Sequence, residues 1–126
     1  MNVSKATDSN QNSPLIEMIS HLGRPCTVPL ILALGDRSYN ADIHELRNSI
    51  DVSEGKKLST ATISKCLLNL EQIGVVEGTV HAQSPPRAEY CLTMTGQQLY
   101  RHLLQIRHLA ENAASDRNLV DSMSAC

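Results

Sequence analysis

The clearest indication of the fold is the stretch Pro85-Pro86-Arg87-Ala88-Glu89-Tyr90-Cys91-Leu92-Thr93. Its two prolines close a turn-like segment, residues 81–87, and residues 88–92 alternate in a way that suits a β-strand. A matching strand begins upstream at Val75-Val76 and runs to about Val80. We therefore expect two antiparallel strands that pair as a hairpin.

A capped helix is expected immediately before this hairpin. Ser59 is a good N-cap, and apolar residues recur with helical spacing from Ile63 to Leu70, which gives a helix to about Ile73. Gly74 follows at the position where glycine often ends a helix. This helix should therefore lead directly into the first strand.

Four more helices complete the expected order, with Asn40 as the cap of the third and Thr93 as a candidate cap of the last. They span residues 14–22, 28–34, 40–50 and 95–114. We expect a disordered tail over 1–13, a polar loop over 51–57 and a frayed tail over 115–126. The order predicts one α+β, mostly helical domain over 14–114: a winged helix-turn-helix with a two-stranded wing and flanking dimerisation helices.

The composition fits a folded domain with a mild excess of basic residues in its middle segment. The 126 residues are 41% hydrophobic and include no Phe or Trp, so aliphatic side chains must fill the core. Net charge is −2, yet residues 56–101 hold five Lys and Arg against three Asp and Glu. No apolar run is long enough for a membrane span or a signal peptide, so we expect a cytoplasmic protein with no membrane partner.

The sequence contains no motif that predicts a catalytic site or a metal site. Five histidines lack ligand spacing with a cysteine or carboxylate, and the four cysteines form no Cys-x-x-Cys pair. No phosphate-binding loop or nucleophile motif is present. We expect no enzyme, no metal and no cofactor.

In a winged helix-turn-helix, the second helix of the unit enters the major groove and the wing lies beside it. The candidate DNA-contacting residues are those before and on helix 59–73 and those in the turn of the hairpin. They are Lys56, Lys57, Ser59, Thr60, Ala61, Ser64, Lys65, Asn69, His81, Gln83 and Arg87. Two alternatives stay open: the helix face is merely solvated, and Arg87 pairs with Glu89.

A dimer is predicted from two apolar stripes. On the last helix the spacing is four, three and four, as in a short coiled-coil seam. The candidate dimerisation residues are Leu15, Ile19 and Leu22 on the first helix and Leu99, Leu103, Ile106 and Ala110 on the last. A homodimer would read a palindromic duplex.

Cys26 is the candidate redox residue, because it lies near a helix N-terminus and near Arg24, and both favour a thiolate. A thiol-based redox-sensing regulator is therefore an alternative function. A buried, inert thiol is the simpler interpretation.

The run from Ser84 to Leu99 resembles the wing and following helix of the HxlR family of regulators. The run from Leu58 to Val76 resembles that family's recognition helix and its exit into the wing, and Thr27 to Leu32 resembles its early core helix. The resemblance implies a dimeric transcriptional regulator of the wider PadR/MarR-like superfamily. The chain is a divergent example, with Arg24-Pro25-Cys26 where the family has Gly-Lys-Trp.

The resemblance leaves one alternative of another class, a winged-helix protein-interaction module without DNA binding. An acidic N-terminal half and an Arg-poor recognition helix favour it. No small-molecule effector can be read from the sequence.

Overall fold

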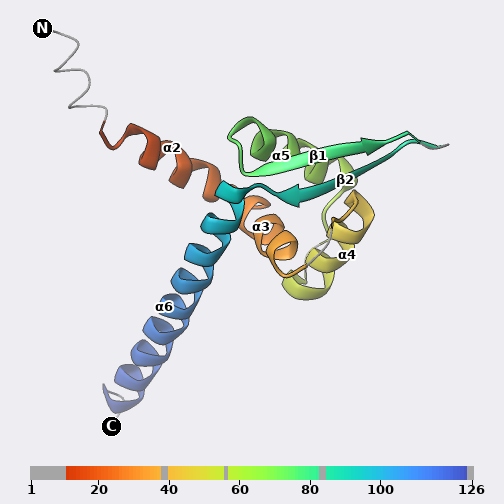
Figure 1. The fold of residues 1–126 in the computed structure, drawn as a ribbon. Coiled ribbons are helices and arrows are strands. Elements are labelled where there is room, and N and C mark those ends of the chain that lie inside the picture. Colours follow the sequence, from red (N-terminus) through yellow and green to blue (C-terminus); the bar gives the residue numbers. More distant parts are fainter. Residues whose placement is uncertain (1–10, 38–39, 56, 83–84, 125–126) are drawn as a thin grey trace, which may run out of the picture.

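The computed structural model describes residues 11–37, 40–55, 57–82 and 85–124. In these described residues, four helices precede a two-stranded antiparallel sheet, and a long helix follows it (Figure 1). The elements are α2 (Ser13–Leu22), α3 (Thr27–Gly35), α4 (Ile43–Glu54), α5 (Thr60–Gln72), β1 (Val76–His81), β2 (Arg87–Leu92) and α6 (Met94–Ser124). The expected mostly helical α+β fold with a two-stranded wing is confirmed.

The helix before the wing begins and ends where its capping residues predict. The hydroxyl of Ser59 accepts a hydrogen bond from the Thr62 N–H at 3.1 Å, which satisfies a donor in the first turn of α5. Gly74 follows the C-cap with φ of 79°, a left-handed conformation that costs glycine little. The chain then reverses into β1, and Val76 pairs with Leu92 of β2.

An aliphatic core joins α3, α4, α5 and the base of the wing, as the lack of Phe and Trp requires. Tyr90 and Leu92 pack against it from β2. Its most deeply buried large side chains are Leu30, Ile31, Leu46, Ile50, Ile63, Leu67, Leu70 and Val75.

Helix α4 differs from its prediction at both ends. The N-cap is Asp42 instead of Asn40, because the Asp42 carboxylate accepts from the Glu45 N–H and the Glu45 carboxylate accepts from the Asp42 N–H. The helix continues through residues 51–54, which we expected in a loop, and ends at Gly55 with φ of 66°. The reciprocal cap fixes the start of α4 more firmly than a single Asn could.

The terminal helices also differ from expectation. Helix α6 continues to Ser124, ten residues beyond its expected end at Ala114, so most of the expected frayed tail is helical. No Gly or Pro interrupts the sequence after Gly96, which explains the extension. Residues 1–10 of the expected N-terminal tail lie outside the described residues, and Ser13 begins α2.

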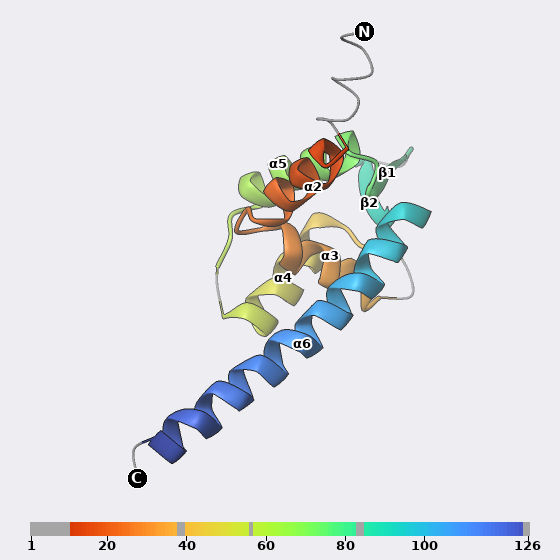
Figure 2. The same ribbon diagram turned by 90° about the vertical axis from the view of Figure 1, so that its left-hand side faces the viewer.

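Helices α2 and α6 project from the body on the side away from the wing tip (Figures 1 and 2). Helix α6 passes very close to α3, since a Cβ on Gly35 would lie 2.0 Å from the Tyr100 ring. Among the described helices, none combines the length and the apolar character needed to cross a membrane.

Candidate nucleic-acid interface

Helix α5 presents one polar face to solvent and one apolar face to the core. Ala61, Ser64 and Lys65 are exposed, whereas Thr60 and Asn69 are half-buried. The opposite face is anchored by side chains that are buried: Ile63, Cys66, Leu67 and Leu70. The structure therefore brings together four of the predicted contact residues, Thr60 to Lys65, on the first two turns of a firmly packed helix.

The remaining candidates around α5 are placed unequally. Lys57 is exposed just before the helix, whereas Lys56 and Gln83 lie outside the described residues. The Ser59 hydroxyl is already occupied, because it caps the helix and lies 2.9 Å from the Thr62 hydroxyl. Lys65 is the single basic residue between positions 60 and 72, so it carries the positive charge of this helix alone.

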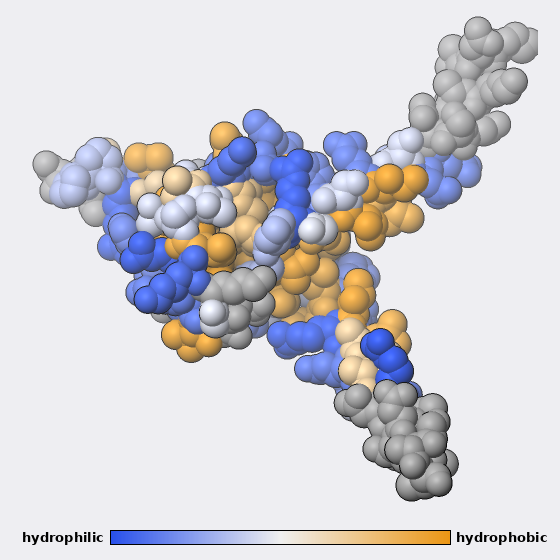
Figure 3. All heavy atoms as spheres, turned by 180° about the vertical axis from the view of Figure 1, so that it is seen from behind, coloured by the Kyte–Doolittle hydropathy of each residue, from blue (hydrophilic) through white to orange (hydrophobic). Residues whose placement is uncertain are grey.

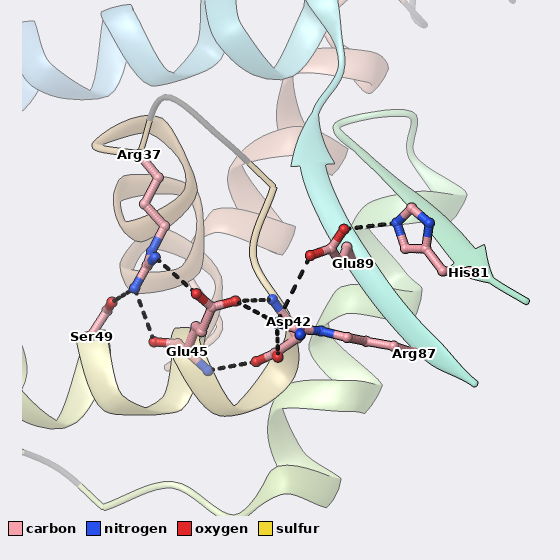
Figure 4. Close-up of polar contacts among 7 residues, drawn as sticks. All are labelled: Arg37, Asp42, Glu45, Ser49, His81, Arg87 and Glu89. Atoms are coloured by element: carbon pink, nitrogen blue, oxygen red, sulfur yellow. Dashed lines mark hydrogen bonds and ion pairs between the residues drawn. The ribbon is translucent and has the colours of Figure 1, made fainter. Parts of the chain in front are cut away.

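Arg87 lies in a cluster of carboxylates at the side of the wing (Figure 4). Its Nη2 is 2.6 Å from Asp42 Oδ2, 3.4 Å from Glu45 Oε1 and 3.9 Å from Glu89 Oε2. The alternative ion pair with Glu89 is thus present but is the longest of the three. The guanidinium joins β2 to the N-terminus of α4, and a DNA contact by Arg87 stays a prediction.

The backbone explains why Arg87 finds Asp42. Ala41 forms an isolated bridge with Tyr90, with N–H to carbonyl distances of 3.0 and 2.8 Å in the two directions. This bridge lays the segment before α4 along β2, so Asp42 stands beside the wing. The sequence held a signal for this residue, since Asp42 and Glu45 have the spacing of a capping box. The partner on the wing had no such signal.

Two further contacts extend the cluster. His81 Nε2 lies 2.7 Å from Glu89 Oε1, which is a diagonal pair across the hairpin. Arg37 follows α3, and its Nη1 lies 3.6 Å from Glu45 Oε2. Its Nη2 donates a hydrogen bond to the Ser49 hydroxyl at 2.9 Å. The hydrogen bond from the Glu45 N–H, together with the positive charge of Arg87, lowers the pKa of Asp42. The wing is therefore tied to α4 by charged groups.

The predicted dimerisation residues divide into two groups. Leu103 is buried in the core of its own protomer, and Leu22 and Leu99 pack partly against that core, so these three offer little to a partner. The others are exposed, and two apolar neighbours that the sequence analysis missed are exposed with them. This exposed set is Leu15, Ile16 and Ile19 on α2 and Ile106, Leu109 and Ala110 on α6. Figure 3 shows apolar side chains on both projecting helices.

The cysteines are arranged differently from the expectation. Cys26 is buried, and its pKa is raised by a hydrogen bond with Cys66 and by burial. Hydrogen bonds from Cys26 and Thr27 lower the pKa of Cys66, aided by the charge of Arg24. The expected thiolate character thus belongs to Cys66, which spacing along the chain could not reveal. No group of three metal-ligating side chains occurs in the described part of the chain.

The geometry is that of a winged helix-turn-helix domain. The model of the HxlR-like helix-turn-helix family matches residues 43–118, and the chain belongs to that family. No curated protein matches the sequence.

Solved structures share this fold. The redox regulator HypR in its reduced form has a TM-score of 0.67 and 27% identity over 86% of this chain and 98% of HypR. The reduced regulator YodB from B. subtilis has a TM-score of 0.65 and 23% identity over 78% and 89% of the two chains. The structure described as a possible HxlR family transcriptional factor from Thermoplasma volcanium GSS1 has a TM-score of 0.60 and 24% identity over 79% of this chain and 81% of that chain.

Proposed function

We propose that this chain is a homodimeric regulator of transcription that binds duplex DNA sequence-specifically and inserts α5 into the major groove. The observation that carries the proposal is α5 itself, a helix capped by Ser59 with a small, polar and exposed N-terminal face. Small side chains permit close approach to the bases, and the helix N-terminus favours a nearby phosphate. A protein that binds the chromosome works where the DNA is, so we place it in the cytoplasm.

Each exposed side chain of α5 has a chemical use at the groove. The Thr60 and Ser64 hydroxyls can contact phosphates or bases, and Ala61 can pack against a thymine methyl group. Lys65 can reach a phosphate or a guanine, and Lys57 can contact the backbone just before the helix. Asn69 is half-buried and lies farther along α5, so it would contact DNA only if the helix enters the groove deeply.

The wing would lie over the adjacent backbone. Arg87 would contribute mainly by holding β2 against α4, because the carboxylates of Asp42, Glu45 and Glu89 already surround its guanidinium. His81 is exposed near the tip, but its Nε2 lies 2.7 Å from Glu89 Oε1, so a phosphate that it binds would have to displace that carboxylate.

The exposed apolar stripes on α2 and α6 support the dimer. Leu15 and Ile19 are 59% and 57% exposed, and Ile106 is 55% exposed, although all three are large apolar side chains on helices. A second copy would bury them and set two α5 helices apart on one face of a palindromic operator.

The proposal is tested with DNA selected from a genomic library by the purified protein. Lys65→Ala should weaken binding of the selected duplex by about fivefold to 150-fold, the range for loss of one good contact. It should also flatten the dependence of affinity on salt, by roughly 0.9 in the log–log slope if the contact is to phosphate. The control is Arg117→Ala, which removes an equal charge from an exposed position on α6. Equal effects of the two substitutions on DNA affinity would mean that α5 does not contact the DNA.

A protein-interaction module without DNA binding is the second candidate. The observation that favours it is the carboxylate cluster around Arg87, since Asp42, Glu45 and Glu89 would repel phosphates near the wing. Selection from genomic DNA that yields no enriched sequence, with protein partners retained on the same immobilised chain, would favour this candidate.

A further inference from the structure

Two buried thiols meet between the start of α3 and the middle of α5. Cys26 is the N-cap residue of α3, and Cys66 lies on the buried face of α5, forty positions along the chain. The thiols are hydrogen-bonded to each other, and the Thr27 hydroxyl lies 3.6 Å from the Cys66 sulfur. Cys66 therefore stands directly behind the helix face that carries Ser64 and Lys65.

Both sulfurs lie near the edge of the core. Cys26 and Cys66 keep exposed fractions of 5% and 7%, whereas their core neighbours Ile63 and Leu67 keep 0% and 1%. The exposed segment Gly23-Arg24-Pro25 directly precedes Cys26, and the charge of Arg24 acts on Cys66. A small neutral oxidant can reach sulfurs at such a position after a slight local movement, which is harder at the centre of the core.

The pair has an attacking and a resolving partner. Hydrogen bonds from Cys26 and Thr27, with the charge of Arg24, favour the thiolate of Cys66, the reactive form of cysteine. Cys26 keeps its proton and lies in contact with that sulfur. This arrangement suits capture of an oxidised Cys66 by Cys26.

We propose that Cys26 and Cys66 form an intrachain disulfide on exposure to a peroxide, and that this modification displaces α5 and weakens DNA binding. In the first step, the Cys66 thiolate attacks a peroxide oxygen, the O–O bond breaks, and Cys66 becomes a sulfenic acid while hydroxide leaves. The Cys26 sulfur then attacks the Cys66 sulfur, the S–O bond breaks, and the Cys26 proton leaves with the oxygen as water. Two thiols are oxidised and one hydrogen peroxide is reduced to two waters.

The expected consequence for α5 follows from the packing. A disulfide draws the two sulfurs to about 2.05 Å, well inside their hydrogen-bonding separation. The surrounding core is close-packed and passes such a displacement on to neighbouring elements. Helix α5 must therefore move relative to α3, which shifts Ala61, Ser64 and Lys65 from their positions at the groove. This last step rests on the DNA-binding function proposed above.

The test uses the full-length chain with Cys91→Ser and Cys126→Ser, so that only the pair can react. After hydrogen peroxide, we expect non-reducing peptide mapping to show a Cys26–Cys66 linkage with the mobility of a single chain on a denaturing gel. The matched control adds Cys26→Ser, which keeps a hydrogen-bonding group and should leave Cys66 without a disulfide. Circular dichroism melts of each variant show that it is folded.

The outcomes separate the modification from its effect on DNA. A disulfide between two chains, or a Cys66 sulfinic acid without linkage, would overturn the proposed pair, whatever the DNA result. If the linkage forms, DNA affinity should fall at least tenfold and return on reduction with dithiothreitol, while the Cys26→Ser control shows no reversible loss. A linkage with unchanged affinity for the selected duplex would overturn the displacement of α5, and failure to bind any duplex before oxidation would count against the proposed function instead.

Discussion

Helices α5 and α2 are both amphipathic, but they use their apolar faces in opposite ways. Helix α5 buries Ile63, Leu67 and Leu70 and turns its polar face to solvent. Helix α2 has no buried residue, and its Leu15 and Ile19 remain exposed. A helix whose apolar face is satisfied within the protomer can offer its polar face to a ligand, whereas a helix left with an open apolar face is suited to another protein surface.

The largest effect should come from removing the anchor of α5. Leu67→Ala deletes a fully buried side chain and should lower the free energy of unfolding by about 2–5 kcal/mol, through lost burial and a cavity. Chemical denaturation monitored by circular dichroism measures the change. Leu68→Ala is the matched control, because Leu68 is 54% exposed on the same helix. Similar losses for both leucines would mean that α5 is not anchored as described.

The open face of α2 gives the next largest effect. Ile19→Asp should weaken the dimer by about 2–3 kcal/mol, since each dimer loses two partly buried apolar side chains, and should leave each protomer folded. Analytical ultracentrifugation over a range of concentrations measures the dissociation constant. Ser20→Asp adds the same charge at an exposed neighbour outside the stripe and serves as control. A wild-type chain that remains a monomer at micromolar concentration would mean that the apolar face of α2 does not bind a second copy.

The wing differs from α5, because polar contacts hold the wing in place whereas apolar contacts hold α5. Asp42→Ala should cost about 1–2 kcal/mol of stability, since it removes both the N-cap of α4 and the partner of Arg87. Asp42→Asn keeps a capping oxygen and loses only the charge, so it should cost under about 1 kcal/mol, as partly exposed ion pairs do. Thermal melts of the two variants separate the cap from the ion pair. Equal costs would mean that the ion pair, not the cap, carries the stability.

The smallest expected effect is on the pH dependence of stability in acid. The pKa of Asp42 is lowered in the folded state by the Glu45 N–H and by Arg87, so its contribution to stability is complete above the unfolded value, about 3.9. That contribution is lost as the pH falls below this value and through the lower pKa of the folded state. Asp42→Asn should therefore flatten the acid limb of stability against pH below about pH 4. An unchanged limb in the variant would assign the acid sensitivity to other carboxylates.

Elements that depend on neighbours along the chain could be predicted from the sequence. Ser59, Gly74 and the Pro85-Pro86 turn act through local hydrogen bonds and backbone preferences, and the structure confirms the helix and the hairpin that they bound. The exposed face of α5 followed from helical spacing alone, because burial of one face fixes the direction of the other.

Contacts between distant segments depend on how the helices and strands pack against one another, which spacing along the chain does not reveal. The Ala41–Tyr90 bridge brings Asp42 to Arg87, and the packing of α3 on α5 brings Cys26 to Cys66. The packing of α6 on α3 buries Leu103 while it leaves Ile106 exposed, although both fit one heptad pattern. Spacing shows which residues share a face of one helix, but the crossing of helices determines which part of that face another element covers.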